Sequence, residues 1–115
     1  MQNKSKAIKL AFEEKTKLLT GYGNMQTFCL EGKNISSLNF ADGPHGVRAE
    51  KEKNCTHFPN LCNLASSWNV KTAYLMGQAL AKDCIMHNIN VLLGPGVNIK
   101  RHILCGRNFE YFSED

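Results

Sequence analysis

The hydrophobic positions of the chain follow two spacings, one helical and one extended. Apolar residues recur at helical intervals over residues 4–19 and again over 70–87, which predicts two helices. Asn69 precedes the second repeat and suits an N-cap, because its side-chain oxygen can accept a hydrogen bond from a first-turn amide. Apolar runs at 35–41 and 89–93 predict two short strands. The predicted order is therefore helix, strand, helix, strand.

Strands that alternate with helices indicate an α/β fold with parallel strands. The intervening segments are less regular. Residues 61–68 mix apolar and small side chains and predict either a strand or a buried turn. Residues 50–60 are polar and predict a loop, and 97–115 predict either a long functional loop or the start of another helix. A chain of 115 residues has room for one small domain.

The charge and hydropathy of the chain argue against two classes of partner, nucleic acids and membranes. The 14 basic and 10 acidic residues are scattered, so the net charge of +4 forms no dense basic patch and nucleic-acid binding is not expected. No apolar run approaches the roughly 20 residues that cross a bilayer, so no membrane span is expected. The N-terminus shows no signal-peptide pattern and carries Glu13 and Glu14. We therefore expect a cytoplasmic location.

Cysteines and histidines are dispersed and match no metal or redox spacing. An odd number of cysteines without a paired pattern predicts free, mostly buried thiols in a reducing compartment. His45 and His102 are interpreted as structural or solvent-facing residues. The sequence therefore predicts neither a metal nor a cofactor. The five cysteines are Cys29, Cys55, Cys62, Cys84 and Cys105.

The first candidate functional motif follows the first predicted strand, at Asp42-Gly43-Pro44-His45-Gly46-Val47-Arg48. An ionised carboxylate only accepts hydrogen bonds, so Asp42 suits two neighbouring sugar hydroxyls. Arg48 could pair with this carboxylate or reach a further hydroxyl. The alternative is a turn-capping aspartate, because Asp before Gly is common in turns.

The second motif follows the second predicted strand, where Gly94-Pro95-Gly96 leads to Cys105-Gly106-Arg107-Asn108-Phe109-Glu110. The glycine turn matches no phosphate-binding pattern, and Pro95 removes an amide donor. Arg107 is either a fork for a substrate or half of a structural ion pair with Glu110 or Glu114. Its residue type and position leave both alternatives open.

Together the two motifs resemble glycoside hydrolase family 3, in its β-glucosidase branch. The resemblance covers nearly the whole chain, and its pieces occur in the order that the family shows. They lie at residues 12–21, 42–48, 58–59, 64–69, 92–99 and 106–115.

The resemblance implies that residues 1–115 are the N-terminal fragment of a (β/α)8 TIM-like barrel domain, with its first βα units only. The family's enzymes are retaining exo-glycosidases that remove a terminal non-reducing β-linked sugar, usually glucose. By motif, Asp42 is expected to bind hydroxyls of that sugar, and Arg48 and Arg107 to line the same pocket. A β-glucoside or oligosaccharide is the expected substrate, and the oligomeric state is not predicted. For Trp68, a core aromatic role is favoured over sugar stacking.

The chain lacks the residues that retaining hydrolysis requires, which are two carboxyl groups about 5 to 5.5 Å apart. The family's nucleophile lies in a Ser-Asp-Trp-like motif, and neither this motif nor the family's Lys-His pair occurs here. The family's acid/base residue typically lies in a later domain. We therefore expect no catalytic residue in this chain.

Size adds a further expectation, because a complete (β/α)8 barrel takes about 250 residues. An incomplete parallel sheet exposes its edges and an apolar face, so the isolated chain is expected to be marginally folded or prone to aggregate. Two hypotheses follow: part of a β-glucosidase that contributes sugar-binding residues, or a truncated or vestigial fragment without activity. A third is another α/β enzyme whose loops imitate these motifs.

Overall fold

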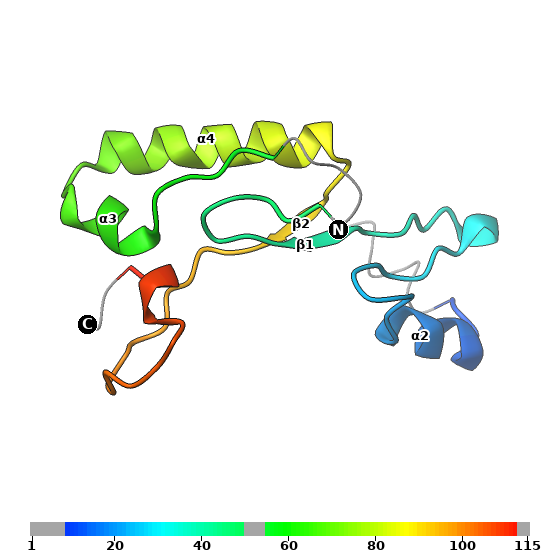
Figure 1. Cartoon of the computed structure of the whole chain (residues 1–115). Coiled ribbons are helices and arrows are strands. Elements are labelled where there is room, and N and C mark those ends of the chain that lie inside the picture. Colours follow the sequence, from blue (N-terminus) through cyan, green and yellow to red (C-terminus); the bar gives the residue numbers. More distant parts are fainter. Residues whose placement is uncertain (1–8, 50–54, 113–115) are drawn as a thin grey trace. The chain divides into compact units, whose positions relative to one another are not determined.

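The computed structural model describes residues 9–49 and 55–112, and the chain divides into two compact units, 1–39 and 40–115. The first unit contains helix α2 (Phe12–Leu19), shown in blue in Figure 1. The helix predicted over 4–19 is therefore wrong at residues 9–11, which are not helical. The Glu14 carboxylate accepts a hydrogen bond from the Ala11 amide at 2.8 Å, which fixes the start of the helix one residue later. Residues 4–8 of the prediction lie outside the described residues.

The rest of the first unit is a folded-back segment around a single 3₁₀ turn, η1 (Glu31–Lys33). The Leu30 amide donates to the Ile35 carbonyl at 2.8 Å, and the Thr27 amide donates to the Leu38 carbonyl at 3.0 Å. These bonds use the backbone of residues that the sequence assigned to a strand over 35–41. That prediction is wrong for residues 35–39, because their backbone pairs within the first unit.

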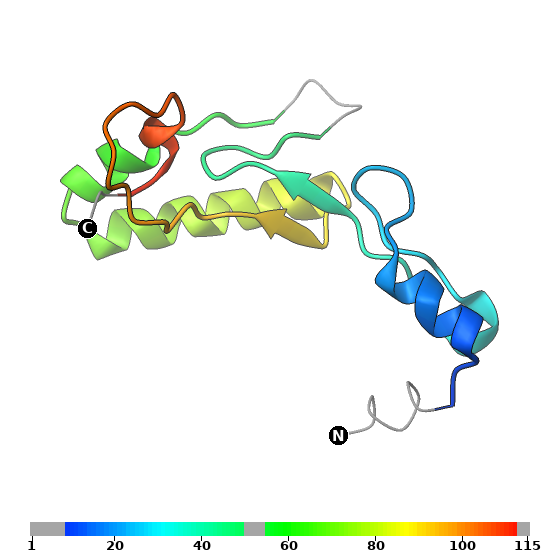
Figure 2. The same cartoon turned by 90° about the horizontal axis from the view of Figure 1, so that it is seen from below.

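The second unit contains the sheet. Strand β1 (Phe40–Asp42) pairs in parallel with strand β2 (Val91–Leu93), and the register places Asp42 opposite Leu93. Helices α3 (Leu61–Ser66) and α4 (Val70–Met86) lie between the strands in sequence. The predicted α/β fold with parallel strands is confirmed at this level. In Figures 1 and 2, α4 runs along one face of the strand pair.

Helix α4 agrees with its prediction at both ends. The Asn69 side chain caps the N-terminus by accepting a hydrogen bond from the Thr72 amide at 3.2 Å. At the C-terminus, Asn88 adopts a left-handed conformation with φ of 56°. The Ile89 amide then donates to the Cys84 carbonyl at 2.8 Å, which satisfies a carbonyl that the helix leaves open. The chain turns directly from this cap into β2.

Residues 61–68 are not the strand or buried turn that their composition predicts. Residues 61–66 form α3, and the Asn60 side chain caps that helix by accepting a bond from the Asn63 amide at 3.0 Å. Leu61 is 1% exposed and anchors the helix in the core. The asparagine before the run was the signal for a helix, because asparagine is a preferred N-cap.

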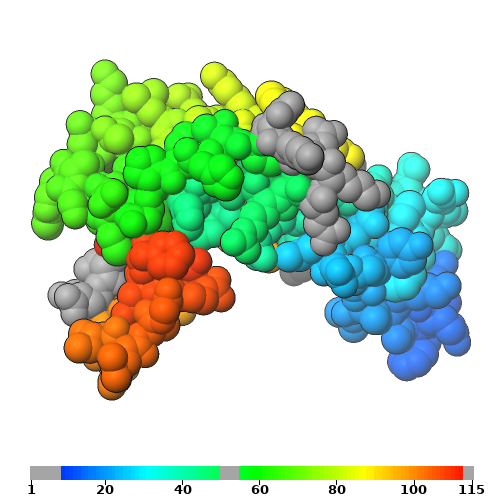
Figure 3. Space-filling view, viewed as in Figure 1, coloured from blue at the N-terminus to red at the C-terminus, as the bar shows by residue number. Residues whose placement is uncertain are grey.

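The described core is small. Only a few apolar side chains are buried, and four long apolar side chains stand exposed on residues 97–104, the orange segment of Figure 3. Trp68 is 94% exposed, so its predicted place as a core aromatic is wrong among the described residues. The buried apolar residues are Leu10, Ala41, Val47, Leu61 and Met76. The exposed group on the orange segment is Val97, Ile99, Ile103 and Leu104.

The five cysteines are free, as predicted, but the prediction that most are buried is wrong. Cys29 and Cys105 are exposed, and the other three are half-buried. Among the described helices, none is both long and apolar enough to cross a membrane.

Candidate functional site

The first turn, residues 42–48, begins at the C-terminal end of β1. The Arg48 amide donates to the Asp42 carbonyl at 2.8 Å, so the turn closes on itself and brings both residues to the strand end. Gly43 has a φ of 143°, and a Cβ atom there would lie 1.9 Å from the Gly46 carbonyl oxygen. Only glycine fits this position. The closed backbone therefore presents Asp42 and Arg48 at the same rim, and both are exposed.

The second turn, residues 94–111, begins at the C-terminal end of β2. The pairing of Asp42 with Leu93 places the starts of the two turns side by side. A Cβ atom on Gly94 would lie 3.1 Å from the Pro44 Cα atom, which shows how closely the two backbones approach. The parallel register therefore makes one site from segments that are about fifty residues apart in the sequence.

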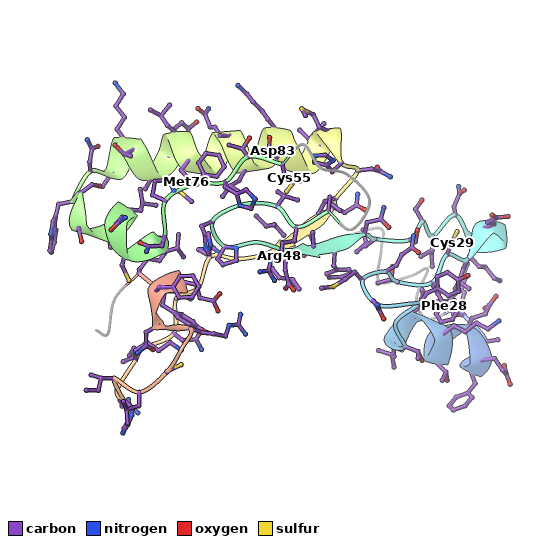
Figure 4. The ribbon with its side chains drawn as sticks, viewed as in Figure 1. Phe28, Cys29, Arg48, Cys55, Met76 and Asp83 are labelled. Carbon is purple, nitrogen blue, oxygen red and sulfur yellow. The ribbon has the colours of Figure 1, made fainter. Side chains whose placement is uncertain are left out.

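A cavity of about 320 Å³ lies between the two turns, and Asp42, Arg48 and Arg107 all line it. The structure thus brings together the three residues that the sequence singled out. Figure 4 labels Arg48 on the segment that follows β1. Their role in binding a sugar stays a prediction. The other lining residues are Gly43, Pro44, His45, Gly46, His57, Leu93, Gly94, Pro95, Gly96, Asn98, Phe109, Glu110 and Tyr111.

The two alternatives for Arg107 are both compatible with the structure. Its Nε atom forms an ion pair with Oε1 of Glu110, one turn further along the chain. The hydrogen bond to Glu110, and then the negative charge of that residue, raise the pKa of Arg107. Arg107 nevertheless lines the cavity, and its side chain is 74% exposed. Glu114, the other suggested partner, lies outside the described residues.

Contacts with α3 and with Gly96 hold the end of the second turn. The Cys62 thiol of α3 donates to the Tyr111 carbonyl at 3.0 Å. Gly96 forms a parallel bridge with Tyr111, and a Cβ atom on Gly96 would lie 2.8 Å from the Glu110 carbonyl oxygen. The 3₁₀ turn η2 (Asn108–Glu110) is thereby fixed near the start of the second turn.

A buried aspartate anchors the segment that carries His57. Asp83 of α4 is 8% exposed, and its Oδ2 atom accepts a hydrogen bond from the Thr56 amide at 3.0 Å. Figure 4 labels Asp83 on α4 and Cys55 on the neighbouring segment. The bond ties the backbone next to His57, a cavity residue, to the long helix. The hydrogen bond satisfies the buried carboxylate, which is typical of a residue with a structural role.

Sequence reasoning missed part of the cavity. It treated Glu110 only as an ion-pair partner and assigned no role to His57, Asn98, Phe109 or Tyr111. The three-residue spacing between Arg107 and Glu110 was the available signal, because such residues are neighbours on one turn. His45 contacts Phe109 edge-on, with ring centroids 5.8 Å apart, and it also lines the cavity, so its interpretation as structural stays a prediction.

His102 is exposed, and its Nδ1 atom accepts a hydrogen bond from the Leu104 amide at 3.1 Å. This agrees with the interpretation of His102 as a solvent-facing residue. Among the described residues, no cluster of three histidine, cysteine or acidic side chains is arranged to hold a metal ion.

The cavity carries charged side chains of both signs. Among the described lining residues, Asp42 and Glu110 are the carboxylates, and Glu110 is already paired with Arg107. A general acid or nucleophile needs a carboxyl group that can face the reacting atoms. The described site therefore offers the Asp42 carboxylate as an acceptor and the guanidinium groups of Arg48 and Arg107 as donors, and together they can bind several hydroxyl groups.

Comparisons with known proteins agree with this arrangement. The glycosyl hydrolase family 3 N terminal domain matches residues 11–115. Thermostable beta-glucosidase B of Acetivibrio thermocellus is 43% identical over 92% of this chain and 15% of its own length. The exo-alpha-(1->6)-L-arabinopyranosidase of Bifidobacterium longum is 41% identical over 92% of this chain and 16% of its length.

A solved structure shares the backbone as well as the sequence. The beta-glucosidase from Kluyveromyces marxianus in complex with glucose has a TM-score of 0.90 and 35% identity over 97% of this chain and 14% of that one. The chain thus spans about one sixth of the length of the proteins it matches. Over residues 11–115, this chain belongs to the glycosyl hydrolase family 3 N terminal domain family.

Proposed function

We propose that the cavity between the two turns binds the terminal non-reducing sugar of a β-glucoside, as part of a retaining β-glucosidase site. Asp42 accepts hydrogen bonds from sugar hydroxyls, and Arg48 and Arg107 donate to neighbouring hydroxyl oxygens. The observation that carries the proposal is the common cavity of these three residues. Membership of the family supports it, and so do relatives whose names describe β-glucosidases.

The physical basis is selective binding of a polar ring in a site with fixed charges. A carboxylate and a guanidinium offer charge-assisted hydrogen bonds, which are about twice as strong as bonds between neutral groups. Bonds that strengthen as the ring distorts toward the transition state accelerate cleavage. The backbone of the first turn is closed by its own hydrogen bond, and contacts with α3 and Gly96 hold the end of the second. The backbone that carries the charged groups therefore needs little rearrangement when the sugar enters.

The carboxyl groups that cleave the bond are proposed to come from residues other than those of the cavity described here. The 115 residues alone should therefore bind a sugar without hydrolysing it. Behaviour as a non-catalytic fragment is the second candidate function, and the pairing of Glu110 with Arg107 favours it for the isolated chain. The cytoplasmic location stays a prediction.

The preferred sugar is a separate question. One relative is an arabinopyranosidase, and L-arabinopyranose lacks the hydroxymethyl group of glucose. We propose glucose, because the beta-glucosidase from Kluyveromyces marxianus was solved with glucose. Parallel assays with aryl β-glucoside and aryl α-L-arabinopyranoside test this choice.

The test uses a chimera, defined as thermostable beta-glucosidase B of Acetivibrio thermocellus with this chain in place of its matching segment. The chimera should cleave an aryl β-glucoside. Asp42→Ala should lower kcat/KM on the order of 100-fold, because buried hydroxyls lose a charged partner worth about 2 to 3 kcal/mol. Glu31→Ala is the matched control, since Glu31 is exposed and lies in the other unit.

The same assay tests the arginines. Arg48→Ala and Arg107→Ala should each lower kcat/KM by more than about tenfold. Arg101→Ala is their control, because Arg101 is exposed on the second turn and does not line the cavity. The proposal fails if Asp42→Ala stays within about twofold of the parent in a folded, active chimera.

A further inference from the structure

Glu110 has no part in the sugar contacts proposed above, although it lines the cavity. Its side chain is 12% exposed, whereas that of its partner Arg107 is 74% exposed. A long exposed arginine samples many rotamers, and restricting it on binding costs conformational entropy. An ion pair with a buried, fixed carboxylate removes much of that freedom before the sugar arrives.

The backbone around Glu110 is fixed from several directions. Its amide donates to the Arg107 carbonyl at 3.2 Å, which closes the single turn of η2. Its carbonyl packs against Gly96, where no Cβ atom would fit without movement. The next residue, Tyr111, accepts the bond from Cys62. The carboxylate is therefore attached to a backbone position that several contacts restrain.

The geometry of the pair leaves most of the guanidinium for a second partner. Glu110 engages the Nε atom of Arg107. A guanidinium carries five N–H donors, and four of them are on the two terminal nitrogens. One carboxylate can thus bind the Nε atom and leave the two terminal nitrogens of Arg107, a cavity residue, for a second partner.

We propose that Glu110 is a positioning residue, whose carboxylate holds the Arg107 guanidinium in the orientation that binds the sugar. This inference rests on the proposed function, because it assumes that Arg107 contacts the substrate. Glu110 acts through Arg107 and does not touch the reacting atoms. Its role is therefore distinct from that of a nucleophile or a general acid.

The test is a double-mutant cycle in the chimera, with Glu110→Gln, Arg107→Ala and both together. Glu110→Gln keeps the shape of the side chain and removes its charge. We expect kcat/KM to fall about tenfold, since misplacement of a binding group by about 1 Å costs up to 100-fold. In the Arg107→Ala background, Glu110→Gln should have no further effect on kcat/KM, because the group that it positions is gone.

A purely structural role predicts a different result. Glu110→Gln would then lower kcat/KM equally with and without Arg107, and it would lower the thermal midpoint in both backgrounds. Either finding overturns the inference. A catalytic role for Glu110 is also distinguishable, because Glu110→Gln would then lower kcat much further than Arg107→Ala does.

A second variant leaves Glu110 untouched, in case Glu110→Gln does not fold. In Arg107→Lys, a single ammonium group must serve both the carboxylate and the sugar, and it lacks the planar fork. We expect kcat/KM to fall nearly as far as in Arg107→Ala. Recovery to within about twofold of the parent would overturn the two-partner arrangement.

Asp42→Ala separates failure of this inference from failure of the proposed function. If Asp42→Ala and Arg107→Ala reduce kcat/KM but Glu110→Gln does not, the sugar site stands and the positioning role is wrong. If Asp42→Ala has no effect on kcat/KM, the proposed function itself fails, and this inference fails with it.

Discussion

The two turns that form the cavity both follow the C-terminal end of a strand, but different contacts hold them in place. The turn after β1 is short, and its own backbone closes it, through the bond from Arg48 to Asp42 and the approach of Gly43 to Gly46. The turn after β2 is long and carries exposed apolar residues, and side chains and distant backbone hold its end. A short turn fixes its charged residues by local geometry, whereas a long one needs added contacts.

The largest expected effect comes from breaking the first turn at Gly43. Gly43→Ala should lower the stability of the chimera by about 3 kcal/mol or more, because the new methyl group would collide with backbone and the φ of 143° suits only glycine. Chemical denaturation of the chimera measures this loss. Gly106→Ala is the control, since a Cβ atom there meets nothing within 4 Å. Equal stability of the two variants would show that the first turn is not closed as described.

A smaller effect is expected from Gly96→Ala, at the point where the second turn returns to its start. The added methyl group would press on the Glu110 carbonyl at 2.8 Å, and overpacking of this kind costs about 1 to 3 kcal/mol. The shift of η2 would also move Glu110. We therefore expect the loss of kcat/KM, expressed as a free energy, to exceed the loss in the free energy of unfolding. Enzyme assays and thermal melts of the same preparation provide both values. A variant with parental kcat/KM would contradict a restrained second turn.

Loss of the contact from α3 should have a smaller effect again. Cys62→Ala removes one thiol bond to the Tyr111 carbonyl, worth about 1 kcal/mol. The affinity of the chimera for glucose as a competitive inhibitor should weaken by a few-fold, and Cys29→Ala should leave it unchanged because Cys29 is exposed in the other unit. Cys62→Ser, which keeps a donor, should recover part of the loss. Equal inhibition in all three variants would show that α3 does not support the turn.

The smallest expected effect is a difference in reactivity between two thiols, which is measured without any substitution. Cys105 is exposed on the second turn, whereas Cys84 lies on α4, where burial and then the nearby charges of Asp83 and Cys55 raise the pKa of its thiol. A raised pKa means less thiolate at neutral pH, so Cys84 should be alkylated more slowly than Cys105. Raising the pH should narrow the difference as the Cys84 thiol ionises. Peptide mapping by mass spectrometry measures both rates, and faster labelling of Cys84 would contradict the described packing of α4.

The sequence predicted the parts of the molecule whose signals are local. The Asn69 cap, the apolar stripe of α4 and the apolar run of β2 each specify an element from neighbouring residues. The end of each strand carried the residues that line the cavity, because parallel strands deliver their C-terminal ends to one edge. Asp42 and Arg107 could therefore be singled out from motif and position.

Other features depend on contacts that a linear pattern does not contain. Residues 35–39 have strand-like composition, but their backbone pairs with Thr27 and Leu30 in the first unit. Trp68 has the composition of a core residue, yet it adopts a φ of 48° at the junction of α3 and α4 and faces outward. The positioning role proposed for Glu110 could not be predicted from the sequence for the same reason, because the burial of its side chain comes from packing around η2.

A crystal structure of the chimera with bound glucose tests the central claim most directly, that both turns hold one pyranose ring. We expect a single glucose in the cavity, with hydrogen bonds from Asp42 and Arg48 on the first turn and from Arg107 on the second. A glucose bound through one turn alone, or bound away from Asp42 altogether, would contradict this account.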